Sequence, residues 1–485
     1  MSISGSLSNA LSGLNAASRA AEVVSSNIAN ALTDGYGRRE LELSSRSLAG
    51  AGAGVKVDGI RRIVDEGVIA DRRLADAAFG EVSVRLDFLS RIENSIGIPD
   101  DPQSLNGRIA ALEASLVEAS SRPDSEPRLQ RVLARAHDLA GHFEAISDDI
   151  QGFRSDADQA IATQVDTLNS SLQRVADLNH EIRLSRGAGR DATGLMDQRQ
   201  QTIDEISQII PVKAVDRDFD QLALITPGGS VLLDGKAATL EFSPVGVIVP
   251  EMTLQSGALS GLSINGQPVS TSGGNAPIAG GSLAANFALR DETAVQAQTR
   301  LDAVARDLVE RFQDPATDPT LGVGDAGLFV DGSGAFSAAD EIGLSSRLGI
   351  NAAVDPNQGG EVWRIRDGIG ALAQGDVGQS SGLQSMLGAL TDDRVPVSGG
   401  FMGAARSLSG LAGDFLSGIG SARQNAESDK SYLQTKAETL KELELENGVD
   451  SDHEMQQLLL VEQAFAANAR VIQTVDEMIQ SLLRI

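Results

Sequence analysis

The side chains suited to acid–base or nucleophilic catalysis are few in this chain. Its 485 residues include four histidines and no cysteine, which excludes thiolate nucleophiles, thiolate metal sites and disulfides. The Gly378–Gly382 segment, with Ser380 at its centre, matches the spacing of a hydrolase nucleophile elbow. The only histidine downstream is His453, at the start of an expected helix, and no buried strand leads into the segment. We therefore expect no catalytic residues and no enzyme activity.

Two further patterns match ligand sites only in part. Asp216, Asp218 and Asp220 have the opening spacing of a calcium loop, but the turn glycine and the bidentate glutamate of that loop are missing. The Gly322–Gly327 segment has the spacing of a dinucleotide-binding loop, yet a strand-like apolar run follows it where a phosphate-binding helix is needed. We interpret both as loops and expect no cofactor and no metal ion.

Acidic residues dominate the charge of the chain. Its 67 Asp and Glu exceed its 40 Lys and Arg, which gives a net charge of −27. Such a surface repels polyanions, so we expect neither nucleic acid nor an anionic membrane as a partner. No apolar run reaches the roughly 18 residues of a membrane-spanning helix, and residues 1–19 do not have the pattern of a cleavable secretory signal. We expect a protein that is cytosolic or leaves the cell by another route.

Both ends of the chain carry apolar residues at the alternating four- and three-residue spacing of a coiled coil. Six of eight positions are apolar in the N-terminal series, which is Leu7, Leu11, Leu14, Ser18, Ala21, Ser25, Ile28 and Leu32. Seven of eight are apolar in the C-terminal series, which is Leu458, Val461, Phe465, Asn468, Ile472, Val475, Ile479 and Leu482. We predict a helix at each end. The predicted assembly seam consists of Leu7, Leu11, Leu14 and Ile28 with the whole C-terminal series.

The C-terminal series follows Ser451–Glu454, which fits a capping box at the start of a helix. Its one polar member, Asn468, is typical of the single buried Asn that fixes register in a coiled coil. The spacing alone fits a core helix of a closed bundle equally well. An isolated amphipathic helix of this length is only marginally stable, however, since its ordering costs about as much as its burial returns. We therefore expect the ends to pair with one another and with neighbouring subunits, and to be mobile in a lone subunit.

The longest helical pattern runs from Pro127 to about Arg186. Its apolar positions keep heptad spacing except for one four-residue shift between Ala157 and Ile161, a stutter that locally unwinds a supercoil without ending the helix. A helix of about 60 residues would span roughly 90 Å, which is typical of a rod.

The pattern changes after Pro211, where Asp234-Gly235 and Asn265-Gly266 predict two β-hairpins. The predicted fold class is mainly α with a small inserted β domain, with long coiled-coil-like helices and paired N- and C-terminal helices. The expected domains are 1–35 plus 450–485 as terminal coiled-coil helices, 36–64 as a linker with short strands, 65–210 plus 283–449 as a long-helix bundle, and 211–282 as the β insertion. Residues 313–400 look irregular.

Several segments resemble a known family. Asn27-Ile28-Ala29-Asn30, followed by Thr33-Asp34-Gly35-Tyr36-Gly37-Arg38, resembles the N-terminal motif of bacterial flagellar rod, hook and hook-associated proteins. The motif residues are Asn27, Asn30, Thr33, Gly35, Tyr36 and Arg38. The segments at 54–65, 195–199, 203–207, 281–283, 290–291 and 467–478 are similar to the hook-associated protein 1 family, whose members join hook to filament.

The resemblance implies a structural component of the bacterial flagellum, formed by self-assembly at the hook–filament junction. It implies export through the flagellar type III apparatus, with the protein cytoplasmic before export. It also implies the partners: other copies of the chain, the hook protein, hook-associated protein 3, and an export chaperone at the C-terminal helix. Alternatives are another axial protein, such as a hook or distal rod subunit, and a secreted coiled-coil effector.

Overall fold

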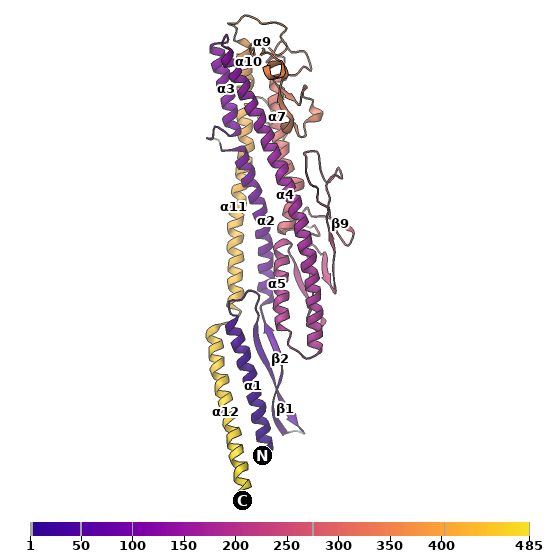
Figure 1. Ribbon diagram of the computed structural model, residues 1–485, viewed down its shortest axis with the longest axis vertical. Helices are drawn as coiled ribbons and strands as arrows, with labels where there is room; N and C mark the ends of the chain where they lie inside the picture. The colour runs from indigo at the N-terminus through magenta and orange to yellow at the C-terminus, as the bar shows by residue number, and fades with distance from the viewer. Residues whose placement is uncertain (1–2, 49–50, 99, 274–275, 402, 485) are drawn as a thin grey trace.

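The computed structural model describes residues 3–48, 51–98, 100–273, 276–401 and 403–484, and the molecule is elongated (Figure 1). The helices of eight residues or more are α1 (Ile3–Ala29), α2 (Glu66–Ile96), α3 (Leu105–Ser121), α4 (Glu126–Gly187), α5 (Thr193–Ile209), α6 (Gly281–Ala288), α7 (Ala294–Gln313), α10 (Ser381–Thr391), α11 (Leu408–Glu446) and α12 (Ser451–Leu483). The two termini lie at the same end of the molecule. The predicted, mainly helical fold class is confirmed.

The long helix α4 is the central helix of the body, the part of the molecule that comprises α2 to α11 and the strands between them. Its bounds, Glu126–Gly187, agree with the predicted 127–186, and no break interrupts its 62 residues. Its buried residues lie on both sides of the predicted four-residue shift. Before the shift they belong to a core shared with α2, α3, α7 and α11, and from Ile161 to Val175 they belong to a second core shared with α5 and α6. The stutter therefore lies where one apolar core gives way to the other.

The inserted strands share the second of these cores. The strands are β3 (Lys213–Arg217), β4 (Gln221–Ile225), β5 (Val231–Asp234), β6 (Lys236–Ala237), β7 (Leu240–Glu241), β8 (Leu262–Ile264) and β9 (Gln267–Val269). They form antiparallel sheets in the orders β3-β4-β5-β6 and β7-β8-β9. Buried Leu224, Leu233 and Leu262 pack in one cluster with Leu168 of α4. The insertion is thus a cover on the helices, with no core of its own among the described residues.

The region 313–400, which looks irregular in sequence, is packed into the first core. It contains β10 (Phe329–Asp331), α8 (Leu344–Arg347), β11 (Leu348–Ile350), α9 (Arg364–Asp367) and α10. Phe329 contacts Phe312 of α7 edge to face, with 5.1 Å between ring centroids. Its elements are too short to show a periodic pattern, which explains why sequence reasoning found none.

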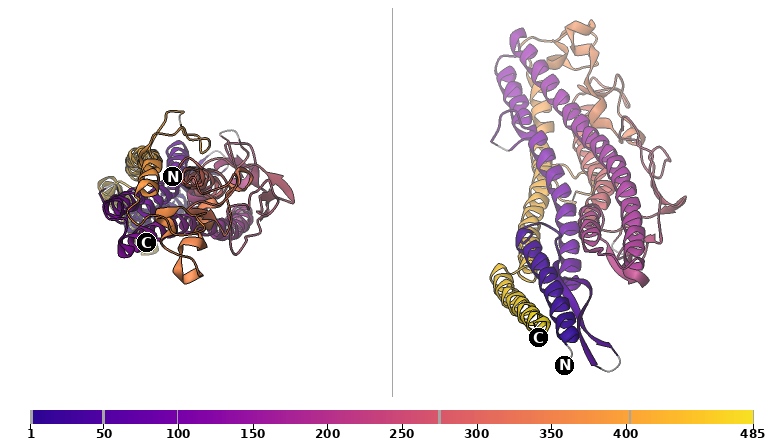
Figure 2. Two further views of the ribbon diagram at one scale, coloured as in Figure 1. Left: turned by 90° about the horizontal axis from the view of Figure 1, so that it is seen from above. Right: turned by 60° about the horizontal axis from the view of Figure 1, so that its bottom comes forward.

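The segment predicted as a linker with short strands is a long antiparallel hairpin. It consists of β1 (Arg38–Leu48) and β2 (Ala51–Ile63), of 11 and 13 residues, so the prediction of short strands is wrong. Most of the described side chains on both faces are exposed or half-buried. The apolar alternation that marks a half-buried strand is therefore weak in this sequence. In Figure 2 the hairpin lies beside α1, below the body.

A buried ion pair, Arg290–Asp158, links α4 to the insertion near the stutter; with its hydrogen-bond partners we call it the buried charged layer. Arg290, in a π-helical turn between α6 and α7, is fully buried and pairs with Asp158 of α4 at 2.6 Å. The Asp158 carboxylate also accepts a hydrogen bond from the backbone N–H of Val245, and Arg290 donates one to the backbone oxygen of Ser260. Both charges are thus paired and further hydrogen-bonded, as buried ions require.

Removing one member of this layer should destabilise the body strongly. Asp158→Ala leaves the Arg290 guanidinium buried with less negative charge, which costs about 3–5 kcal/mol. The matched control is Asp156→Ala, since Asp156 forms an exposed pair with Arg91 and its loss costs about 0–1 kcal/mol. Urea unfolding followed by circular dichroism measures both. Equal midpoints for the two variants would contradict a structural role for the layer.

Candidate assembly interface

The helices at the two ends of the chain lie side by side and run antiparallel (Figure 1). Two contacts fix the register: Asn27 of α1 binds Glu454 of α12, and Gly13 faces Asn468. A Cβ atom on Gly13 would lie 2.7 Å from the Asn468 side-chain oxygen, so the absence of a side chain lets the helices approach there. Asn468 is half-buried, and its amide donates to the backbone oxygen of Ala464 in its own helix.

On α1 the buried face differs from the predicted stripe. The buried residues are Ala10, Ala16, Ala17, Val23, Val24 and Asn27, mostly with small side chains. Of the predicted seam residues, Leu14 and Ile28 are half-buried, whereas Leu7 and Leu11 are exposed. The predicted stripe follows the largest aliphatic residues, but closely packed helices favour small residues at their contact. Leu7 and Leu11 are therefore no part of the buried face within this subunit.

On α12 the predicted stripe lies mainly on the less exposed side of the helix. Val475 is buried, and Leu458, Val461, Asn468, Ile472 and Ile479 are half-buried. Phe465 and Leu482 are exposed. A second set of apolar side chains on α12 is exposed as well, and comprises Met455, Leu459, Leu460, Val471, Met478 and Leu483. The terminal pair thus presents apolar surface that its own subunit does not cover.

A fully buried amide joins the terminal pair to the hairpin. Asn27 Nδ2 donates to the backbone oxygen of Arg39 at 2.9 Å and to Glu454 Oε2 at 3.0 Å. Its Oδ1 accepts from the Tyr36 hydroxyl at 2.9 Å and from the backbone N–H of Arg39 at 3.0 Å. Both polar atoms of the amide are satisfied by groups from three segments, which gives the first motif residue a physical role.

Glu454 takes part in this junction and not in a capping box. The side chain that caps α12 is Asp450, which accepts hydrogen bonds from the backbone N–H groups of Asp452 and His453. Glu454 is buried, with Arg38 Nη1 at 3.6 Å from its Oε1. The prediction of a capping box at Ser451–Glu454 is therefore wrong, because a tertiary partner takes the carboxylate that a box would use.

The other motif residues shape the turn between α1 and β1. Asn30 Nδ2 donates to the backbone oxygen of Ser26, and the Thr33 hydroxyl lies 3.4 Å from Asn30 Oδ1. Gly35 has a φ of 76°, a conformation that glycine adopts without strain. Burial raises the pKa of Tyr36, partly offset by Ser26 and Arg39, so its hydroxyl stays protonated and can donate to Asn27.

One carboxylate of α5 anchors this turn and the hairpin to the body. Asp197 Oδ1 accepts from the backbone N–H of Gly37 at 3.0 Å and from Arg62 Nε at 2.7 Å. Its Oδ2 accepts from Arg39 Nη2 at 2.9 Å. The sequence placed Asp197 in a block of family resemblance but did not indicate what it binds.

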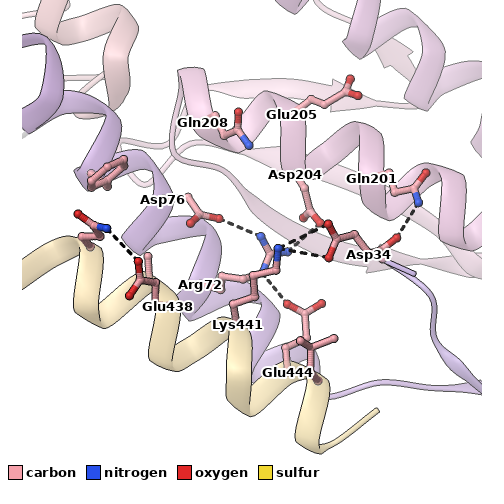
Figure 3. A pocket seen from close by; sticks show the side chains of 15 residues that line it. Asp34, Arg72, Asp76, Gln201, Asp204, Glu205, Gln208, Glu438, Lys441 and Glu444 are labelled. Carbon is pink, nitrogen blue, oxygen red and sulfur yellow. Dashed lines mark hydrogen bonds and ion pairs between the residues drawn. The ribbon is translucent and has the colours of Figure 1, made fainter. Parts of the chain in front are cut away.

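A neighbouring cluster joins the helices at the base of the body (Figure 3). Arg72 of α2 pairs with Asp76 at 2.8 Å, with Asp204 of α5 at 2.7 Å and with Glu444 of α11 at 2.5 Å. Burial lowers the pKa of Arg72, but the carboxylates of Asp204 and Glu444 outweigh it, so the net shift is upward. Lys441 lies 3.2 Å from Asp34, so the turn after α1 also contacts α11.

Of the sequence patterns that partly match catalytic or ligand sites, only the calcium-loop pattern lies near this interface, since Asp216 and Asp220 line a cleft with Arg62. Ser380 immediately precedes α10, and Gly322–Gly327 is a loop that leads to strand β10. Asp220 pairs with Arg186 at 2.8 Å. Across the described ranges, no three His, Asp or Glu side chains are grouped so that they could hold a metal ion. None of the helices there is both long and apolar enough to cross a membrane.

Comparison with known families matches three parts of the chain. A model of the flagellar hook-associated protein FlgK helical domain matches residues 89–318. The flagella basal body rod protein model matches residues 7–36, and the flagellar basal body rod FlgEFG protein C-terminal model matches residues 446–485. Flagellar hook-associated protein 1 of Salmonella typhimurium is 27% identical over 281 residues, which are 53% of this chain and 50% of that protein.

The chain is thus similar to the hook-associated protein 1 family in its helical body, and to flagellar rod proteins at both ends. The Escherichia coli relative is 28% identical over 48% of this chain and 43% of its own length, and the Bacillus subtilis relative is 27% identical over 47% of each. The chain thus spans about half the length of the curated relatives it matches. The solved flagellar hook junction protein FlgK from Burkholderia pseudomallei is 17% identical, with a TM-score of 0.44 over 56% of this chain and 47% of that one.

Loss of the Asn27 amide should loosen the terminal pair and leave the body intact. Asn27→Ala leaves Glu454, the Tyr36 hydroxyl and the backbone of Arg39 short of partners, at about 1–3 kcal/mol for each buried group. Amide hydrogen exchange should rise in α1, in β1 and in the first turns of α12. The control is Asn30→Ala, whose side chain bonds within its own helix and the following turn. Similar exchange in the two variants would argue against Asn27 as the junction.

Proposed function

We propose that this protein is a structural, non-enzymatic subunit of the bacterial flagellum that self-assembles at the hook–filament junction through α1 and α12. The observation that carries the proposal is the apolar surface left uncovered on the terminal pair, which includes Leu7, Leu11, Leu460 and Val471. Covering a large aliphatic side chain gains about 1.5–3 kcal/mol. Contacts with neighbouring subunits would supply that cover.

The separation of the terminal pair from the body supports the same role. Neither of the two large apolar cores includes a residue of α1 or α12. Asn27 bonds the pair to the hairpin, and the hairpin and the turn after α1 are bonded to the body through Asp197 and through the Asp34–Lys441 ion pair. A body that folds without its ends can carry them as assembly elements, whose stability then comes from neighbouring subunits.

The similarity to the hook-associated protein 1 family supports specific partners and a specific location. We infer contacts with the hook protein on one side and with hook-associated protein 3 on the other. We also infer export through the flagellar type III apparatus, with a cytosolic chaperone that covers the exposed apolar side chains of α12 until assembly. The predicted seam residues of α1 and α12 would then contact either the partner helix of the same subunit or a neighbouring subunit.

A hook or distal rod subunit is the second candidate function. The rod-protein models at the two ends favour it, because they describe the wider axial family. The match of residues 89–318 to the FlgK helical domain favours the junction instead, since it lies in the body, outside the shared ends.

Removal of residues 451–485 should separate assembly from folding. Neither large core contains a residue of this segment, so the truncated protein should retain a cooperative unfolding transition. Incorporation into hook–filament preparations and capture by the export chaperone should both fall below detection. Retained chaperone capture would contradict the assignment of the chaperone to α12, and retained incorporation would contradict the assembly role.

Charge placed on either face of α12 should have different effects on the lone subunit. Leu458→Asp and Ile472→Asp alter half-buried positions on the predicted seam, so they should raise hydrogen exchange in α12 and impair incorporation. Leu460→Asp alters an exposed position, so it should impair incorporation while the exchange of the lone subunit stays unchanged. Arg470→Ala, also exposed, is the control and should incorporate like wild type. Equal incorporation of all four variants would show that the seam is misplaced.

A further inference from the structure

A cleft with an excess of arginine lies where the hairpin meets the body. It has a volume of about 430 Å³ and lies between β2, α2, α5, β3 and the end of α4. Six arginines line it, against three carboxylates, from Glu66, Asp216 and Asp220. The arginines are Arg61, Arg62, Arg73, Arg186, Arg199 and Arg217. Acidic residues outnumber basic ones by 67 to 40 in the whole chain, whereas arginine prevails among the charged residues that line this cleft.

Most of these arginines have a carboxylate partner within the subunit. The pairs are Arg61–Glu40, Arg62–Asp197, Arg73–Asp204, Arg186–Asp220 and Arg217–Asp234. Arg199 differs, because it forms no ion pair with any described carboxylate within 4 Å. Its Nη1 donates instead to Asn179 Oδ1 at 2.8 Å and to the backbone oxygen of Asp220 at 2.6 Å.

Arg199 is only 7% exposed, so its charge is poorly solvated. Burial lowers the pKa of Arg199 to about 10, with further lowering by the nearby Arg62 and Arg73 and a partial offset by Asp220 and Asp216. The guanidinium stays charged at neutral pH, but its described acceptors are neutral. A buried cation whose hydrogen-bond acceptors are all neutral gains from one additional carboxylate, because opposite charges attract strongly where water is largely excluded.

The cleft also has the apolar walls that strengthen such a bond. Ile69, Met196, Ile203 and Leu222 line it beside the arginines. Apolar walls lower the local dielectric constant and so strengthen the attraction between opposite charges. The exposed side chain of Arg61 lies at its rim, where it can meet an incoming acidic group.

We propose that this cleft binds an acidic side chain of a second copy of the chain, whose carboxylate pairs with Arg199. The inference rests on the proposed self-assembly, and charge complementarity identifies the partner. Each copy carries 67 acidic residues, whereas its net charge of −27 disfavours polyanions such as nucleic acid. The contact would add a directional, charged bond to the apolar contacts of the terminal helices.

Zero-length crosslinking tests the contact directly, because the chain has only six lysines. The variant Arg61→Lys places an amine at the rim of the cleft, and a carbodiimide then couples that amine to any carboxylate that touches it. Polymers assembled from a mixture of ¹⁴N- and ¹⁵N-labelled subunits should yield crosslinked peptides with one isotope on each side. The control is Arg131→Lys, at an exposed arginine of α4 far from the cleft that pairs with Glu118. Crosslinks at the cleft with the same isotope on both sides only would overturn the proposal.

A second experiment tests the proposal by charge reversal at the rim of the cleft. The double variant Arg61→Glu and Arg217→Glu alters exposed side chains, so it should fold like wild type. Its incorporation should fall at least threefold at low salt, and the difference should shrink in 0.5 M salt as screening increases. Equal incorporation of variant and wild type would refute the cleft while leaving the junction role intact. Failure of wild type to incorporate would refute the proposed function instead. Full protection of the cleft by 10 mM inorganic phosphate, with no mixed-isotope crosslink, would identify a small-anion site and also overturn the proposal.

Discussion

The Asn27 side chain uses its amide hydrogens and its oxygen on groups from α12, from β1 and from the turn between α1 and β1. A buried amide with this many partners has only one orientation that satisfies them all. It therefore fixes three segments relative to one another, although apolar packing between α1 and α12 is modest. Glu454 and Tyr36 are buried or half-buried beside it, so a shift of the terminal pair would leave several polar groups unpaired.

Polar and apolar contacts have separate tasks in this part of the molecule. Directional hydrogen bonds and ion pairs around Asn27 and Asp197 set the orientation of the ends. The exposed leucines of α1 and α12 make no directional bonds through their side chains. Apolar contacts tolerate small changes of angle and distance, because burial depends on area and not on direction. In such a subunit the polar contacts keep the terminal helices in a fixed orientation, while their exposed apolar side chains can pack against neighbours in slightly different positions.

The long, regular elements could be predicted from the sequence. The buried helix faces and the partners of side chains that are distant in sequence could not. The helix α4 and its stutter followed from an apolar pattern sustained over some 60 residues, which few other structures can satisfy. The buried face of α1 could not be found in the same way, because Ala10 and Ala17 carry little apolar signal beside Leu7 and Leu11. Glu454 was assigned to a local cap since its partner, Asn27, is 427 residues away in sequence. The sequence did not indicate the arginine cleft for the same reason, because its lining comes from seven separate elements.

The spacing of three polar residues in α5 explains how this helix contacts its neighbours. Asp197, Gln200 and Asp204 are three and four residues apart, so they lie on one face of the helix. Asp197 binds Arg39 and Arg62 of the hairpin, Gln200 donates to Glu444 of α11 at 2.8 Å, and Asp204 binds Arg72 and Arg73 of α2. One helical face thus holds the hairpin and two long helices at the base of the body. Loss of any one of these three side chains would therefore free a different element from the base of the body.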